Sequence, residues 1–208
     1  MLISDVITAV RAVTGHDVDT QFSDATQLLP VLAQGYRRLR RWLCVHAPNL
    51  CEQSLAVVLT GTTNVILKSA LTDFERIRKI ERMQANGSYY PIIVHDELNS
   101  NQSRDLCAHE QPLQFLLMPA SAAPGSYLVT WVSGAPATIA TTTTLDLPAG
   151  LEDVLINWGA AWVSVRHEVN RGDAAYFTKA ADDILKEQAR LLMNRYGVMS
   201  SPGMVLSR

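Results

Sequence analysis

The 208-residue sequence predicts an α+β protein: a helical bundle built from both chain ends with an inserted small antiparallel β domain. Two observations predict this class. Near both ends of the chain, apolar residues recur every three or four positions, which is the period of an amphipathic helix. Between the ends, apolar residues come in short runs bounded by Gly, Pro and Ser, a pattern typical of a small sandwich or barrel.

The points where the period changes give the predicted domain boundaries. We predict a helical domain over 1–52 and 147–196, an inserted β domain over 53–146, and an extended C-terminal tail over 197–208. The second boundary is abrupt. The segment TIATTTTLDL before Pro148 is rich in β-branched threonine, which suits a strand. The segment LEDVLINWGAAW after it places its apolar residues on one helical face.

Local signals define the two N-terminal helices. The first helix is predicted to run from Leu2 to Val13 and to stop at Gly15. The second is predicted to be capped by Ser23 or Asp24, with Pro30 in its first turns, and to continue to about His46. One of its faces is apolar, and the other carries Arg37, Arg38, Arg40 and Arg41.

Several strands are predicted in the middle of the chain. LAVVLT and NVILK are expected to pair as a hairpin through Gly61-Thr62-Thr63, and 137–145 is expected to supply the last strand. Three further strands are expected at YYPIIV, LQFLLM and SYLVTWV. FERIRKIERMQ fits either period, and HDELNSNQSRDLCAHEQ is predicted to hold a short helix or a loop.

The chain closes with two predicted helices, over about 149–169 and from Asp173 to Gly197. Together with the second N-terminal helix, they supply the predicted structural core. Its members share a helical spacing and a large apolar side chain: Tyr36, Leu39, Leu43, Trp158, Trp162, Phe177 and Ile184.

Composition narrows the class of protein. Hydrophobic residues make up 48% of the chain and charged residues 18%, enough apolar material for a folded core. No run of about 18 apolar residues occurs, so no transmembrane helix is predicted. The opening residues MLISDVITAVRAV lack the features of a secretory signal, and three cysteines do not suggest a disulfide framework, so a reducing compartment is expected. The net charge of −2 argues against nucleic acid as the main partner.

Motifs for catalysis are absent from the sequence. It contains no G-x-S-x-G elbow and no glycine-rich phosphate loop, so we predict no enzyme and no cofactor. The repeated spacing Cys44-x-His46 and Cys107-x-His109 supplies soft ligands suited to zinc, with Cys51 nearby. However, the paired cysteines of structural zinc sites are missing, and a buried thiol is the simpler interpretation. Metal binding therefore remains a secondary hypothesis.

The arginine cluster RRLRR is the strongest candidate for a binding surface. Guanidinium groups on one helical arc can form bidentate contacts with phosphate or with acidic protein surfaces. The alternative is a solvated face, or pairing of these arginines with Asp and Glu residues of the same chain. Because no aromatic platform or basic stripe accompanies the cluster, an acidic protein is favoured over nucleic acid.

The layout resembles the tailed-phage head-to-tail connector proteins, also called adaptor or head-completion proteins. The resemblance rests on GYRRLRRW, on LTDFERIRKIERM followed by ANGSYYPI, on QPLQFLLMPASAAPGSYLVTWV, and on the junction LDLPAGLEDVLINWGAAW before the terminal helix pair. It implies a non-catalytic virion protein, made in the host cytoplasm and located at the head–tail interface, with no membrane contact.

The resemblance also implies partners. Such proteins form rings, commonly of twelve copies, below the portal protein, extend the DNA channel without sequence-specific binding, and dock a tail or nozzle protein. A terminal segment often reaches a neighbour or the portal. The candidate portal- or partner-binding residues are therefore the four arginines and the tail residues Val198, Met199, Met204, Val205, Leu206 and Arg208.

A second hypothesis belongs to a different class. The protein would be a non-catalytic binding module whose β domain recognises carbohydrate or protein, with Trp131 in SYLVTWV as a possible stacking platform. A core position is nevertheless the favoured interpretation of Trp131. Ring formation distinguishes the two hypotheses.

Overall fold

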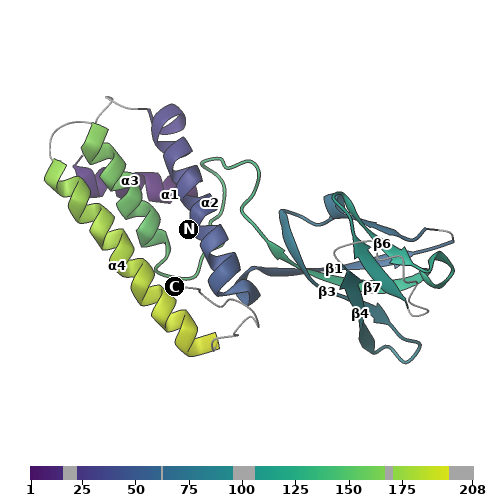
Figure 1. Ribbon diagram of the computed structural model, residues 1–208. Coiled ribbons are helices and arrows are strands. Elements are labelled where there is room, and N and C mark those ends of the chain that lie inside the picture. Colours follow the sequence, from purple (N-terminus) through teal and green to yellow (C-terminus); the bar gives the residue numbers. More distant parts are fainter. Residues whose placement is uncertain (16–22, 62, 96–105, 167–170, 197–208) are drawn as a thin grey trace, which may run out of the picture. The chain divides into compact units, whose positions relative to one another are not determined.

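The computed structural model describes residues 1–15, 23–61, 63–95, 106–166 and 171–196. The chain divides into two compact units, one of Met1–Ala47 with Ala135–Arg208 and one of Pro48–Gly134. The first contains the helices labelled α1 to α4 in Figure 1, and the second contains the strands. We call them the helical unit and the sheet unit.

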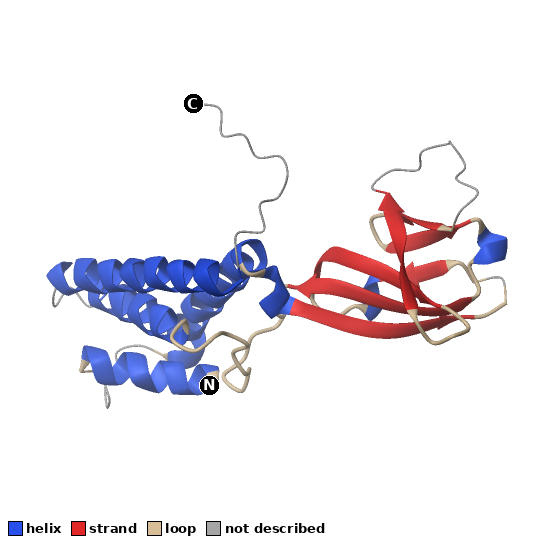
Figure 2. Cartoon of the chain, turned by 90° about the horizontal axis from the view of Figure 1, so that it is seen from below, coloured by secondary structure: helices blue, strands red, loops and turns tan. Residues whose placement is uncertain are grey.

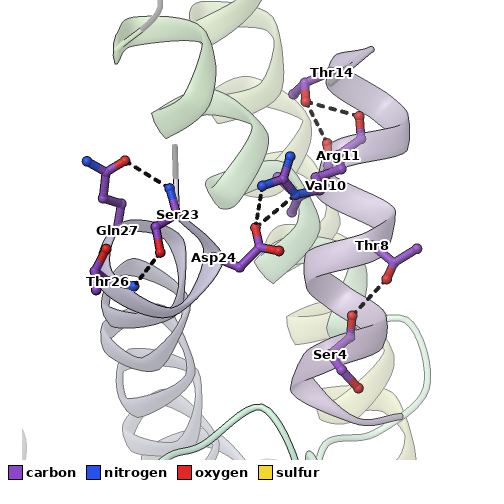
Figure 3. A network of polar contacts seen from close by, with 9 residues as sticks. All are labelled: Ser4, Thr8, Val10, Arg11, Thr14, Ser23, Asp24, Thr26 and Gln27. Atoms are coloured by element: carbon purple, nitrogen blue, oxygen red, sulfur yellow. Dashed lines mark hydrogen bonds and ion pairs between the residues drawn. The ribbon is translucent and has the colours of Figure 1, made fainter. Parts of the chain in front are cut away.

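In the helical unit, the described residues form four α-helices and a short π-helical turn. They are α1 (Ile3–Thr14), η1 (Asp24–Leu28), α2 (Leu29–His46), α3 (Glu152–Arg166) and α4 (Arg171–Tyr196). Gly15, at φ +72°, ends α1 in the left-handed conformation that glycine adopts without strain. The backbone N–H of Thr26 donates to Oγ of Ser23 at 3.3 Å (Figure 3), so the predicted stop at Gly15 and cap at Ser23 are confirmed.

Glycines let the helices of this unit approach closely. A Cβ atom on Gly159 of α3 would lie 2.7 Å from Cγ2 of Val10 and 3.1 Å from Cδ2 of Leu32, so α3 contacts both α1 and α2 at this point. An ion pair adds a polar link: Nη2 of Arg11 lies 2.7 Å from Oδ1 of Asp24 (Figure 3) and joins α1 to the start of η1.

The seven predicted core residues differ in burial. Tyr36, Leu39 and Leu43 of α2 are at most 1% exposed, and the phenol of Tyr36 accepts the backbone N–H of Asp146 at 3.2 Å. The other four, on α3 and α4, are half-buried: Trp158, Trp162, Phe177 and Ile184.

The predicted last strand, 137–145, is not a strand. It forms a single bridge between Thr144 and Leu2, and its carbonyls accept hydrogen bonds from the start of α1 instead. The N–H groups of Ile3 and Ser4 donate to the carbonyls of Thr143 and Thr141, both at 3.0 Å. The first N–H groups of a helix have no partner within the helix. The threonine-rich segment supplies carbonyl acceptors for these N–H groups of α1, and it does not pair as a strand.

The described residues of the sheet unit form seven strands, drawn in red in Figure 2, in the order β1-β7-β3-β4-β5-β6-β2. All neighbours pair antiparallel except β4 and β5, which are parallel. The strands are β1 (Glu52–Leu59), β2 (Val65–Leu67), β3 (Phe74–Met83), β4 (Tyr89–His95), β5 (Cys107–Glu110), β6 (Gln114–Met118) and β7 (Gly125–Ser133).

The predicted fold class is therefore wrong. The protein is not a helical bundle with a small inserted antiparallel β domain, because the strands of the described residues form a nearly closed, mixed, seven-stranded barrel, and four helices make up the other unit. Among the described residues the strands comprise 46 residues and the four α-helices 71, so the β part is a major component. The parallel pairing of β4 with β5 makes the sheet mixed.

Two local predictions in this unit are also corrected. The runs LAVVLT and NVILK do not pair as a hairpin: β1 pairs with β7 along its whole length, from Glu52 opposite Val132 to Leu59 opposite Gly125, and β2 pairs with β6. Eight cross-strand pairs with β7 bury more apolar surface than a hairpin with the three-residue β2 could. The end of the polar segment forms β5, and 96–105 lies outside the described residues.

The barrel encloses its own apolar core. Phe115 and Leu117 of β6, Val129 of β7 and Ile80 of β3 are fully buried there. Trp131 is 3% exposed, and its Nε1–H donates to the carbonyl of Thr72 at 3.0 Å. The expectation that Trp131 is a core residue is confirmed.

Candidate partner-binding surfaces

The four arginines of α2 do not form one exposed face. Arg40 is only 3% exposed, and its Nη1 donates to the carbonyl of Asp146 at 2.8 Å and to the Oδ2 of the same residue at 3.0 Å. Both residues belong to the helical unit. Because a buried guanidinium is tolerated only when it is paired, Arg40 holds the 146 region against α2 and is unavailable to a partner.

The other three arginines are exposed. Arg37 donates from Nη2 to the carbonyl of Ala137 at 3.0 Å. Neither Arg38 nor Arg41 makes a hydrogen bond or ion pair in the described part of the chain. Since α2 contains no Asp or Glu, these two side chains give the helix an exposed, purely cationic edge. That edge is suited to an acidic protein surface.

The six tail residues predicted to bind a partner lie outside the described residues: Val198, Met199, Met204, Val205, Leu206 and Arg208.

An open groove of about 630 Å³ lies between α3 and α4. Trp162 is one of its apolar lining residues, and the guanidinium of Arg166 lies over the Trp162 ring, 5.8 Å from its centroid. Its rim is charged, and Lys186 pairs with Asp183 at 3.5 Å. The lining residues are Ala161, Trp162, Val165, Ala174, Ala175, Thr178, Lys179, Asp182, Asp183 and Lys186.

The two Cys-x-His pairs lie in different units, Cys44 on α2 and Cys107 on β5. In the second pair, Sγ of Cys107 lies 3.5 Å from Nε2 of His109, whose ring stacks on that of His95 at a centroid distance of 5.4 Å. Burial raises the pKa of the Cys107 thiol, which keeps the thiol protonated and a poor metal ligand. Among the described residues, no group of three or more His, Cys, Asp or Glu side chains is placed to hold a metal ion.

The burial of Trp131 also bears on the binding-module hypothesis. A carbohydrate platform requires an exposed ring face, and this indole is enclosed in the barrel core. The residue proposed as that platform is therefore unavailable for stacking.

Comparison with known families decides the class of protein. The family model described as SU10 adaptor protein matches residues 1–204. The chain belongs to the SU10 adaptor family. This is a family of phage head–tail adaptors, so the resemblance found in the sequence is confirmed. No curated protein gives a significant match to the chain.

Family membership gives this SU10 adaptor a structural role as a virion component that interacts with other phage head and tail proteins. In the parts of the adaptor that the structure describes, no helix combines the length and apolar character needed to cross a bilayer.

Sequence reasoning missed one residue of this surface. Asp146 removes Arg40 from the cationic edge, although the two residues are 106 positions apart. One feature of the sequence indicated that Arg40 is buried. On the helical wheel it lies one turn after Tyr36 and next to Leu39, and both of these residues are buried.

Proposed function

We propose that this adaptor assembles as a ring of twelve copies below the portal protein, extends the DNA channel and docks a tail or nozzle protein. The observation that supports this function is the match of one adaptor family model to residues 1–204, which leaves only four residues of the chain outside it. A net charge of −2 suits a channel wall that packaged DNA passes without sequence-specific binding.

The cationic edge of α2 is our candidate for the portal contact. Arg38 and Arg41 are its free members, Arg37 contributes while bonded to Ala137, and Arg40 supports the helix from within. The apolar tail residues between Val198 and Arg208 are the second candidate. Exposed arginines can steer docking onto an acidic groove, because complementary charges speed association and fix the register of the contact.

Charge reversal on α2 tests the portal contact. The double substitution Arg38→Glu with Arg41→Glu is expected to weaken binding to purified portal rings by at least about tenfold, since one lost charge-assisted contact is worth about 1.5–3 kcal/mol. Lys179→Glu with Arg190→Glu on α4 is the matched control, because it reverses two exposed charges that, like Arg38 and Arg41, make no ion pair in the described part of the chain. Equal portal affinity of the two double variants would contradict the assignment.

A further inference from the structure

The outer side of β4 and the adjoining end of β3 carry exposed apolar side chains. Tyr90, Ile92 and Val94 face the barrel core, so their alternating neighbours on β4 face outward. Of these neighbours, Tyr89 is 43% exposed and Ile93 68% exposed. Met83 of β3 lies opposite Tyr89 in the register and is 41% exposed. We call Met83, Tyr89, Pro91 and Ile93 the outer patch.

The charges beside the outer patch neutralise each other. Glu81 lies opposite Pro91 in the β3–β4 register, and its Oε2 is 3.0 Å from Nζ of Lys79. An uncharged apolar patch of this kind on a folded protein typically marks a contact with another protein.

A second apolar surface lies elsewhere on the same unit. Leu67 is 53% exposed and Leu113 is 79% exposed, and the two are adjacent because the N–H of Lys68 donates to the carbonyl of Leu113 at 3.0 Å. The ammonium of Lys68 adds no unpaired charge to this surface. It pairs with the carboxylate of Glu110 at 2.6 Å and lies 5.0 Å from the ring centroid of Phe74. We call Leu67 and Leu113 the knob.

The two surfaces are distinct parts of one folded unit. In the sheet order, β5 and β6 separate β4, which carries the outer patch, from β2, which carries Leu67. Two unlike, mutually compatible surfaces on each copy are what a head-to-tail contact requires, and such a contact closes into a ring when its rotation repeats. The cationic edge of α2, by contrast, would repel the same edge on a second copy.

From this arrangement we infer that the sheet unit forms the contact between neighbouring copies, with the knob of one copy packed on the outer patch of the next. The inference rests on the proposed ring and specifies its subunit interface. Both surfaces are uncharged and apolar, and apolar composition is typical of interfaces that stay assembled.

Two blocking substitutions and their mixture test the inference. Ile93→Lys places a charge in the outer patch, and Leu113→Lys places one in the knob. Each variant alone is expected to lose self-assembly, measured as the mass distribution of the protein by itself and on portal rings. Mixed in equal amounts, the two are expected to form dimers but no rings, because one intact patch and one intact knob remain.

The control is Val165→Lys, which adds the same charge at a comparably exposed position, 61%, in the α3–α4 groove. It is expected to assemble like the wild type, and the melting temperatures of all three variants check that they fold. The inference is overturned if both blocked variants still form rings, if their mixture stays monomeric, or if Ile93→Lys loses only the tail protein. If the wild type itself forms no ring, even on the portal, the proposed function fails as well.

Discussion

Truncation of Trp131 to alanine is expected to lower the free energy of unfolding by about 3–5 kcal/mol, the usual cost of removing a buried tryptophan. Trp131 is 3% exposed and lies on β7, a central strand, where Gln53 of β1 and Ile77 of β3 oppose it on either side. Its removal leaves a cavity in the barrel core and an unpaired carbonyl at Thr72.

Chemical denaturation of the full chain, followed by circular dichroism, measures this effect. Trp131→Phe is the intermediate variant, because it keeps one aromatic ring in the core but loses the N–H donor and part of the indole volume. It is expected to cost clearly less than the alanine variant. An alanine variant within about 0.5 kcal/mol of the wild type, as for a surface position, would show that Trp131 does not support the barrel.

Arg40→Ala is expected to destabilise the helical unit by about 2–3 kcal/mol, less than the roughly 3–5 kcal/mol for breaking a pair in which both charges are buried. The substitution removes two hydrogen bonds to Asp146 and the packing of a nearly buried side chain beside Leu39 and Leu43. The cost is lower than for a fully buried pair because the carboxylate left behind is 73% exposed and stays hydrated.

Arg41→Ala is the matched control for this experiment, since it removes the same side chain from an exposed position of the same helix. It is expected to change the free energy of unfolding by less than about 0.5 kcal/mol. Equal stability of the two variants would mean that Arg40 is not the link between α2 and Asp146. Comparing the two variants also separates an effect on stability from an effect on portal binding, because only Arg41 belongs to the proposed portal contact.

The helices near the N-terminus could be predicted from the sequence because their signals are local. Gly15 ends α1, Ser23 accepts a backbone N–H before α2, and Pro30 lies in the first turn of α2. Each of these effects depends on residues within one helical turn, so a single sequence contains all the information required.

The strand pairing could not be predicted in the same way. Leu59 pairs with Gly125, far along the chain, and not with the nearby β2, and the parallel partner of β4 follows a polar segment that suggests a loop. The segment 137–145 shows a related limit. Threonine content favours a strand, but the open N–H groups of α1 at the other end of the chain determine how these residues are used.

The binding surface was predicted in part. The arginine cluster identified α2 as the cationic helix, but a helical wheel cannot show that Asp146 lies beside Arg40. The exposed apolar residues Ile93 and Leu113 carry no sequence signal of their own, because an apolar residue in a strand or turn is ordinarily assigned to the core.

The central claim, a ring-forming adaptor, is tested most directly by the mass of the assembled species. We would measure the mass distribution of the purified protein over a wide concentration range, alone and with portal rings, together with negative-stain images of large species. We expect closed rings of about a dozen copies, each held by a repeated head-to-tail contact, alone or on the portal. A protein that stays monomeric at every concentration and does not bind the portal would contradict the account.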